Sequence, residues 1–264
     1  MGGKTLSQEQ VVESGLAYFD LQAYIGTTKH VGGLAATREL VALCHIDADT
    51  RVLDVGCGVG ATPCYLAETY GARVVAIDVR EAMIAQARDR ARSEGVEALV
   101  EFVVADARHL PFEDGPFGAA MGESVASFVD DKARVLQEAA RVTGPGGHVG
   151  FNEEVWLKTP PPGAVEFASR AWDVEPLSPA GWVDMLRTVR LQEVVLEPRT
   201  VNARREATQV KRYRLRDLIR MGIRTMSLYV RRPIFRKYMA ERRNLPKNLF
   251  DYLGYVLIVG RKPG

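Results

Sequence analysis

The segment Arg51-Val-Leu-Asp-Val-Gly-Cys-Gly-Val-Gly60 decides the fold, because it joins a short apolar run to three alternating glycines. The apolar and β-branched residues of the run favour a strand. Gly56, Gly58 and Gly60 allow a tight turn and a close approach of the backbone to a ligand. The residues from Thr62 to Thr69 can continue as a helix. We therefore expect a strand, a glycine turn and a helix, with a nucleotide-type ligand at the carboxyl end of the strand.

Asp54, the last acid before the glycines, discriminates between two kinds of cofactor. The spacing Gly56-x-Gly58-x-x-Ala61 also satisfies the loose dinucleotide fingerprint. A carboxylate at this place would, however, repel the pyrophosphate of a dinucleotide in a site of reduced dielectric. S-adenosylmethionine has no phosphate and carries an ammonium and a sulfonium group instead. Asp54 therefore favours that cationic cofactor.

Two later apolar runs also end in an acid. Arg73-Val-Val-Ala-Ile-Asp78 ends about twenty residues after the glycines, where a carboxylate can accept both hydroxyls of a ribose. Val100-Glu-Phe-Val-Val-Ala-Asp106 ends in an acid that is placed to accept from an adenine amino group, while the Ala107 N–H meets a ring nitrogen. One aspartate after a strand is as readily a turn or capping residue. Three in register after successive strands are hard to attribute to capping alone.

On these residues the chain resembles the class I S-adenosylmethionine-dependent methyltransferases, in particular the small-molecule group that includes the ubiquinone and menaquinone C-methyltransferases. The resemblance covers residues 30–200 and the final strand. It implies a Rossmann-like fold, S-adenosyl-L-methionine as methyl donor and S-adenosyl-L-homocysteine as product. The matching segments are Val52-Leu-Asp-Val-Gly-Cys-Gly-Val-Gly60, Ala76-Ile-Asp-Val79 with Met83, Ala105-Asp-Ala-Arg-His-Leu-Pro-Phe112, and Arg141-Val-Thr-Gly-Pro-Gly-Gly147.

The resemblance also implies a set of cofactor-binding residues. The glycine loop would hold the methionine end, Asp78 the ribose, Met83 one face of the adenine, and Asp106 with Ala107 its edge. The sequence departs from the family at Phe117-Gly118, where the family usually has Phe-Asp; that Asp is normally structural. The full predicted set is Asp54, Gly56, Cys57, Gly58, Gly60, Asp78, Val79, Met83, Asp106, Ala107 and Gly122.

The order of patterns along the chain predicts an α/β fold. Helical patterns stand between the first five apolar runs, which indicates a parallel sheet with helices on both faces. The resemblance adds a seventh strand that is antiparallel. Gly144-Pro-Gly-Gly147 is typical of a turn, and 179–190 of a helix. Strands are expected near 51–55, 73–77, 100–104, 117–121, 147–152, 192–196 and 254–260.

Composition indicates one domain over residues 1–264. A chain of 264 residues with 47% hydrophobic residues can bury a single core. Three cysteines without a Cys-x-x-Cys pair and four scattered histidines predict neither a disulfide framework nor a metal site. The sequence has no signal core and no apolar run long enough to span a bilayer. We therefore expect a cytoplasmic protein, either soluble or in peripheral contact with a membrane. Residues 1–45 are expected to form a helical cap, part of which folds over the cofactor.

The stretch Arg199–Lys247 is strongly basic, with sixteen Lys and Arg against three Asp and Glu, although the whole chain carries a net charge of +2. Interleaved apolar residues predict an amphipathic helical lid insertion over 199–250, between the sixth and seventh strands. Its apolar residues are expected to face a lipophilic or anionic small acceptor. A peripheral membrane contact is an alternative, because basic amphipathic helices bind anionic lipid. Nucleic acid is a less expected partner, since no RNA-binding module is recognisable.

Methyl transfer depends mainly on positioning, because the methyl group leaves a sulfonium by in-line displacement. A base is needed only for a phenol, an acidic carbon or a protonated amine. The candidates are Glu123 after the fourth strand, Glu153 after the fifth, and His30 near the cap. Two other functions stay open: an RNA methyltransferase, and a non-catalytic S-adenosylmethionine-binding adaptor that acts through the basic insertion.

Overall fold

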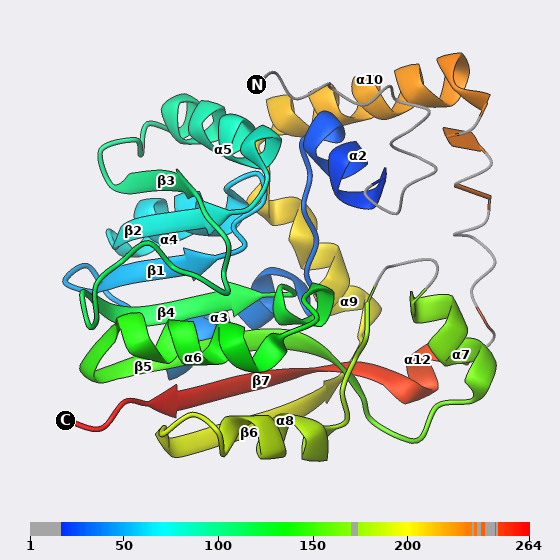
Figure 1. Ribbon diagram of the computed structural model, residues 1–264. Helices are drawn as coiled ribbons and strands as arrows, with labels where there is room; N and C mark the ends of the chain where they lie inside the picture. The colour runs from blue at the N-terminus through cyan, green and yellow to red at the C-terminus, as the bar shows by residue number, and fades with distance from the viewer. Residues whose placement is uncertain (1–16, 170–173, 234, 237–238, 241–245, 247) are drawn as a thin grey trace, which may run out of the picture.

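A seven-stranded sheet in the order β3-β2-β1-β4-β5-β7-β6 forms the centre of the molecule (Figure 1). In this computed structural model the described residues are 17–169, 174–233, 235–236, 239–240, 246 and 248–264. β7 is antiparallel to both of its neighbours, whereas the other adjacent strands are parallel. The predicted Rossmann-like sheet with an antiparallel last strand is confirmed. The strands are β1 (Arg51–Val55), β2 (Arg73–Asp78), β3 (Val100–Val104), β4 (Phe117–Glu123), β5 (Thr143–Trp156), β6 (Gln192–Thr200) and β7 (Leu253–Arg261).

Helices cover both faces of the sheet, because successive side chains along each strand point to opposite sides. Val52 and Val74 belong to the core cluster under three helices, α3 (Gly33–Leu43), α4 (Ala61–Tyr70) and α5 (Glu81–Glu94). Leu53 and Val75 belong to the cluster on the other face, which α6 (Lys132–Val142) and α8 (Pro179–Leu186) cover. The buried sheet holds the carboxyl ends of β1 to β4 at one edge.

The loop between β3 and β4 differs from the expected alternation of strands and helices. Residues 105–116 contain no helix, so that prediction is wrong for this interval. Pro111 and Pro116 lack the N–H groups that a helix needs, and twelve residues leave little room for one. The chain instead crosses the carboxyl edge of the sheet as a loop, where its backbone is free to meet a ligand.

The predicted turn at Gly144–Gly147 lies inside β5, which begins at Thr143. Gly146 has a φ of +74°, and the pairing of β5 with β4 shifts register between Phe117 and Ala119. The glycines therefore form an irregularity within a long strand, as a bulge does, and not a separate turn before the strand.

Short helices lie over the carboxyl edge of the sheet. α2 (Ala17–Ile25) lies near α5 and α10 (Leu215–Arg231), at the top of Figure 1. Residues 1–16 of the predicted cap lie outside the described residues. The insertion between β6 and β7 also contains α9 (Ala203–Glu206) and η3 (Ala207–Arg212), and α7 (Pro162–Phe167) and α12 (Leu249–Tyr252) complete this end. Within the described part of the chain, no helix is long and apolar enough to cross a membrane.

The three glycines after β1 all have a positive φ, which is +71° at Gly56, +53° at Gly58 and +77° at Gly60. Only Gly60 packs against a helix of the core. A Cβ on Gly60 would lie 2.8 Å from the Cβ of Ala87 in α5, so this glycine lets α4 start against α5. Gly60 therefore serves packing, and it lines neither of the pockets described below.

We expect Gly60→Ala to lower the free energy of unfolding by about 2 kcal/mol or more, because it adds a clash with α5 to the strain of a left-handed backbone. Gly95→Ala is the matched control, since Gly95 has a φ of +75° and nothing within 4 Å of the added Cβ. Its loss should stay near 1 kcal/mol. Urea denaturation measures both, and equal losses would contradict the packing role of Gly60.

Candidate functional site

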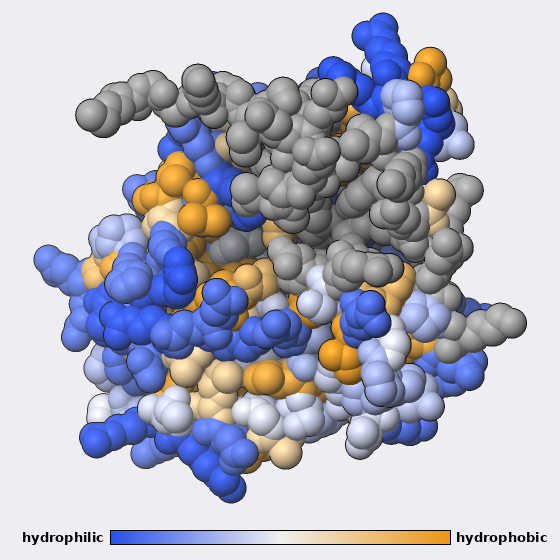
Figure 2. All heavy atoms as spheres, turned by 45° about the vertical axis from the view of Figure 1, so that its right-hand side comes forward, coloured by the Kyte–Doolittle hydropathy of each residue, from blue (hydrophilic) through white to orange (hydrophobic). Residues whose placement is uncertain are grey.

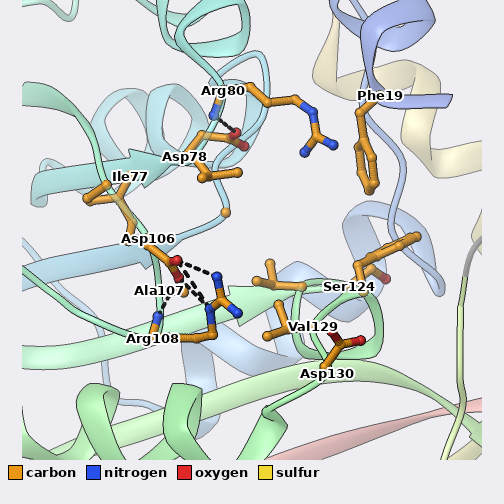
Figure 3. A pocket seen from close by; sticks show the side chains of 15 residues that line it. Phe19, Ile77, Asp78, Arg80, Asp106, Ala107, Arg108, Ser124, Val129 and Asp130 are labelled. Atoms are coloured by element: carbon orange, nitrogen blue, oxygen red, sulfur yellow. Dashed lines mark hydrogen bonds and ion pairs between the residues drawn. The ribbon is translucent and has the colours of Figure 1, made fainter. Parts of the chain in front are cut away.

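Two adjoining pockets form an elongated cleft at the carboxyl ends of β1 to β4, the edge where open α/β sheets bind ligands. The first pocket has a volume of about 280 Å³ and is shown in Figure 3. The second is smaller, about 50 Å³, and extends over the glycine turn. The two pockets share Phe19, Gly56, Asp78, Ser124 and Phe128.

Asp78 lies at the junction of the two pockets. Its carboxylate accepts hydrogen bonds from the N–H of Gly58 at 3.0 Å and from the N–H of Arg80 at 2.9 Å. Burial raises the pKa of Asp78 above its usual value. The carboxylate is held in place by the backbone and retains further lone pairs for ligand hydroxyls.

Phe19 brings α2 to the cleft. The guanidinium of Arg80 stacks on its ring, 4.4 Å from the centroid. Figure 3 shows Phe19 and Arg80 on one side of the first pocket and Asp106 on the other. Phe19 thus brings α2 against the cleft, and it lies within the cap that the sequence predicts over residues 1–45.

Asp106 lines the first pocket together with Ala107 and Val79. Both of its oxygens accept from the Arg108 guanidinium, at 2.7 to 3.1 Å, and its Oδ1 also accepts from the Arg108 N–H at 2.9 Å. This pairing lowers the pKa of Asp106. Sequence reasoning missed Arg108, although its place two residues after Asp106 allows this local fork of hydrogen bonds.

Asp54 lies in the second pocket and is only 2% exposed. Burial, and then the nearby Glu123, raise its pKa well above the usual value. Its Oδ2 has no hydrogen-bond partner. A buried carboxylate oxygen without a donor is unfavourable, so this atom is available to a cationic or donor group of a ligand.

Glu123 also lines the second pocket, and two threonines hold its carboxylate. Thr37 Oγ1 donates to one oxygen at 2.9 Å and Thr62 Oγ1 to the other at 2.7 Å. His30 Nδ1 lies 3.5 Å from the first oxygen. The structure thus brings two of the three predicted base candidates, Glu123 and His30, together in one pocket.

His30 is buried, and burial lowers its pKa to about 4. Its Nε2 lies 3.3 Å from Thr37 Oγ1, and its Nδ1 lies 3.3 Å from the Asn152 side-chain nitrogen. Its Nδ1 also lies 3.3 Å from the Val31 backbone oxygen. With a pKa of about 4, His30 is uncharged at neutral pH.

The third base candidate, Glu153, lies outside both pockets. Its carboxylate accepts from the N–H groups of Val125, Ala126 and Ser127 and from the Ser127 hydroxyl, at 2.8 to 3.0 Å. Burial raises its pKa to about 7. Glu153 thus anchors the loop whose residues 124, 125 and 128 line the cleft, and the structure does not bring it to the ligand side.

The remaining predicted residues divide between the cleft and the core. Cys57 and Gly58 line the second pocket, and a Cβ on Gly58 would lie 2.1 Å from Thr28. Met83, predicted to contact one face of the adenine, lines this second pocket and not the first, which contains Asp106 and Ala107. Gly122 lines neither, because a Cβ there would lie 2.7 Å from the Phe151 ring. Among the described residues no cluster of potential metal ligands occurs.

Arg212 of η3 is a pocket residue that sequence reasoning missed. It is only 8% exposed and lines the second pocket. Its Nη1 donates to Gln209 at 2.9 Å and its Nη2 donates to Thr62 Oγ1. In the sequence it is one of sixteen basic residues in Arg199–Lys247, and no local signal distinguishes it from the others.

The apolar residues of α10 do not face the cleft. Five of them are 54% to 73% exposed and none lines either pocket, so the prediction that they face an acceptor is wrong for this helix. They share one side of the helix, at helical spacing. We call them the α10 stripe: Leu215, Ile219, Ile223, Met226 and Val230.

Comparison with known proteins agrees with the fold. Residues 53–151 match the protein-family model described as a methyltransferase domain. Methyltransferase GfsG of Streptomyces halstedii is 39% identical over 123 residues, which are 47% of this chain and 44% of that protein. Phosphoethanolamine N-methyltransferase 1 of Zea mays is 33% identical over 173 residues, 64% of this chain and 33% of that protein. The chain spans less than half the length of these two relatives.

Solved structures share the fold at low sequence identity. Phosphoethanolamine N-methyltransferase 2 of Haemonchus contortus, in complex with S-adenosyl-L-methionine, superposes with a TM-score of 0.74 at 18% identity and covers 100% of this chain and 62% of that one. The [4+2]-cyclase SpnF superposes with a TM-score of 0.72 at 20% identity and covers 97% and 96%. At these identities the solved structures show a shared fold, and the ubiquinone and menaquinone group stays a prediction.

We expect the stability of the fold to depend on His30 between about pH 7 and about pH 5. Its pKa is lowered on folding, so the unfolded chain binds the extra proton and the native state loses stability as pH falls through the unfolded value of 6.5. The loss should be about 2 kcal/mol over this range. His30→Gln should remove that part of the pH dependence, whereas His109→Gln, on an exposed loop, should keep it. Denaturant titrations at both pH values measure the difference, and parallel curves for wild type and His30→Gln would contradict it.

Proposed function

We propose that this chain is an S-adenosylmethionine-dependent methyltransferase that acts on a small acceptor. The observation that carries the proposal is one cleft in which Asp54, Asp78 and Asp106 lie at the carboxyl ends of three neighbouring strands beside a glycine turn. The methyltransferase-domain match over residues 53–151 supports it. The relatives named as methyltransferases of phosphoethanolamine and of sarcosine and dimethylglycine support a small acceptor.

The cleft suits the two ends of the cofactor differently. The larger pocket, with Asp78, Val79, Asp106 and Ala107, would hold the adenosine, and the smaller pocket over the glycine turn would hold the methionine end. When bound, the cofactor supplies an electrophilic methyl group on a sulfonium. The residues of this chain orient it and exclude water, which is the main contribution to a displacement of this kind.

Glu123 and His30 are the groups that would take a proton from an acceptor. Both line the smaller pocket, and the neutral His30 ring lies beside the Glu123 carboxylate. Glu153 is less suited to this role, since three backbone N–H groups and a hydroxyl already use its oxygens. A base matters only for acceptors that are protonated before attack.

Binding and turnover test the proposal together. Isothermal titration calorimetry with the full chain should show binding of S-adenosylhomocysteine, and NAD should bind more weakly. Mass spectrometry of a cell extract incubated with the protein and methyl-labelled cofactor should then reveal a labelled small molecule. Binding without any labelled product would favour the adaptor alternative, and labelled RNA would favour an RNA methyltransferase. Tighter binding of NAD would overturn the proposal.

Asp78→Ala should weaken S-adenosylhomocysteine binding by about tenfold or more, because the ribose hydroxyls lose a charged acceptor. Asp89→Ala is the matched control, since Asp89 is an exposed acid on α5 that pairs with Arg92 at the surface. Calorimetry should show unchanged affinity for the control. Equal affinities of the two variants would exclude Asp78 from the ribose site.

The α10 stripe supports a peripheral membrane contact. Arg216, Arg220 and Arg231 are exposed on the same helix, beside the stripe. At the top of Figure 2, where α10 lies, hydrophobic and strongly hydrophilic residues stand next to each other. An exposed apolar row bordered by arginines is the pattern of helices that lie in the surface of an anionic bilayer. This contact would bring the cleft close to a lipophilic acceptor.

We expect the chain to co-sediment with phosphatidylglycerol vesicles more than with phosphatidylcholine vesicles, because the arginines and the stripe act together. Replacing Ile219, Ile223 and Met226 by Ser should reduce this binding by about tenfold. Replacing Val165, Val183 and Val194 by Ser, three exposed residues elsewhere, should leave it unchanged. Equal losses in the two variants would show that the stripe has no special role.

A further inference from the structure

We infer that Arg212 binds the carboxylate of the methionyl group of the cofactor, while Asp54 binds its ammonium group, so that the insertion completes the cofactor site. The inference rests on the proposed function and deepens it. It assigns to one residue of the basic insertion a task that the three strand-end acids cannot perform, because a carboxylate is bound by hydrogen-bond donors, and a charged donor binds it more strongly than a neutral one.

Two buried atoms in the smaller pocket have no hydrogen-bond partner, and they are of opposite character. One is Oδ2 of Asp54 and the other is Nε of Arg212. Both side chains are more than nine-tenths buried and both line the pocket. An amino-acid head group carries one group for each of them, since its ammonium donates and its carboxylate accepts.

Among the described residues Arg212 forms no direct ion pair. Nη1 donates to the amide oxygen of Gln209 and Nη2 donates to the hydroxyl of Thr62. Gln209 in turn donates to the backbone oxygen of His30, which fixes its orientation. The nearest acid in the same network, Glu123, receives its hydrogen bonds from Thr37 and Thr62 instead. The guanidinium is therefore positioned by neutral groups and is ready for an anion.

The location of Arg212 favours the cofactor over an acceptor as the source of that anion. Thr62, its partner, lies in the first turn of α4, directly after the glycine turn. The N-terminus of a helix attracts a carboxylate through its unpaired N–H groups and its dipole. The pocket is also small, about 50 Å³, and is lined by two acids, the buried Asp54 and Glu123, whose side chain is 5% exposed. A purely anionic acceptor would be repelled there, whereas a zwitterion is not.

The assignment gives the insertion a role in cofactor exchange. η3 follows β6 and α9 and precedes α10, and Arg212 is its last residue. A carboxylate held by Arg212 would connect the insertion to β1 through the ligand and Asp54. Release of the product would then require these contacts to break.

A thermodynamic cycle tests the inference, because the carboxylate can be removed from the ligand and the guanidinium from the protein. The full chain is titrated calorimetrically with S-adenosylmethionine and with decarboxylated S-adenosylmethionine, which keeps the ammonium and lacks the carboxylate. For Arg212→Ala we expect the affinity for S-adenosylmethionine to fall by about tenfold or more. The affinity of this variant for the decarboxylated ligand should stay within about twofold of wild type.

Two further variants complete the test. Arg204→Ala removes an exposed arginine of the same insertion and should change neither affinity. Arg212→Lys keeps a charge with one donor group and should restore part of the affinity for S-adenosylmethionine only. If Arg212→Ala does not fold, the lysine variant still distinguishes the two ligands.

The outcomes separate this inference from the proposed function. Equal losses for both ligands would show that Arg212 is only structural, and no loss for either would show that the carboxylate lies elsewhere; each overturns the inference and leaves the proposed function standing. If the wild-type chain binds neither ligand, the proposed function fails and the inference fails with it. A selective loss for the ligand that carries the carboxylate supports both.

Discussion

The hydrogen bonds that hold the buried carboxylate of Glu123 are the interaction on which the rest of the site depends. Thr37 of α3 and Thr62 of α4 donate to its two oxygens, and through Thr62 it is linked to Arg212 of the insertion. A carboxylate of this burial is strongly unfavourable without its donors. Strand β4, two helices and the insertion must therefore keep their relative positions, and the cleft keeps its shape as a consequence.

The three aspartates at the ends of neighbouring parallel strands lie in three different electrostatic environments. Asp54 is buried and lacks a donor on one oxygen, so its pKa is raised well above the usual value. Asp78 is held by two backbone N–H groups at the junction of the pockets. Asp106 is paired with Arg108 and has a lowered pKa. One end of the cleft therefore has Asp54, a buried acid that lacks a hydrogen-bond donor, and the other end has Asp106, whose charge is paired with Arg108. This arrangement suits a ligand with a cationic group at one end and an uncharged base at the other.

The basic insertion divides its charges between two tasks. Arg212 enters the smaller pocket, and Arg214 and Arg216 donate to the body of the protein at Glu68 and Ser93. The α10 stripe, by contrast, points away from the cleft and stays exposed. Its sequence has the spacing of an ordinary core-facing helix, yet α10 contacts α2, to which Arg224 donates at Tyr24, and the stripe stays uncovered. A single amphipathic pattern therefore did not reveal which side the fold would cover.

The sequence by itself determined the sheet, the glycine turn and the three strand-end acids, because strand alternation, positive φ angles and the end of an apolar run are local properties. Only the tertiary structure decided which residues around them meet. Arg212 reaches Thr62 across 150 positions of the chain. Glu153 anchors a loop whereas Glu123 faces the cleft, although the sequence predicted both to follow a strand; Glu123 ends β4 and Glu153 lies within β5. Gly60 and Gly122 adjoin the core instead of a ligand. Such differences depend on which distant side chains fill the space beside each residue, and packing of that kind leaves no periodic signal in the chain.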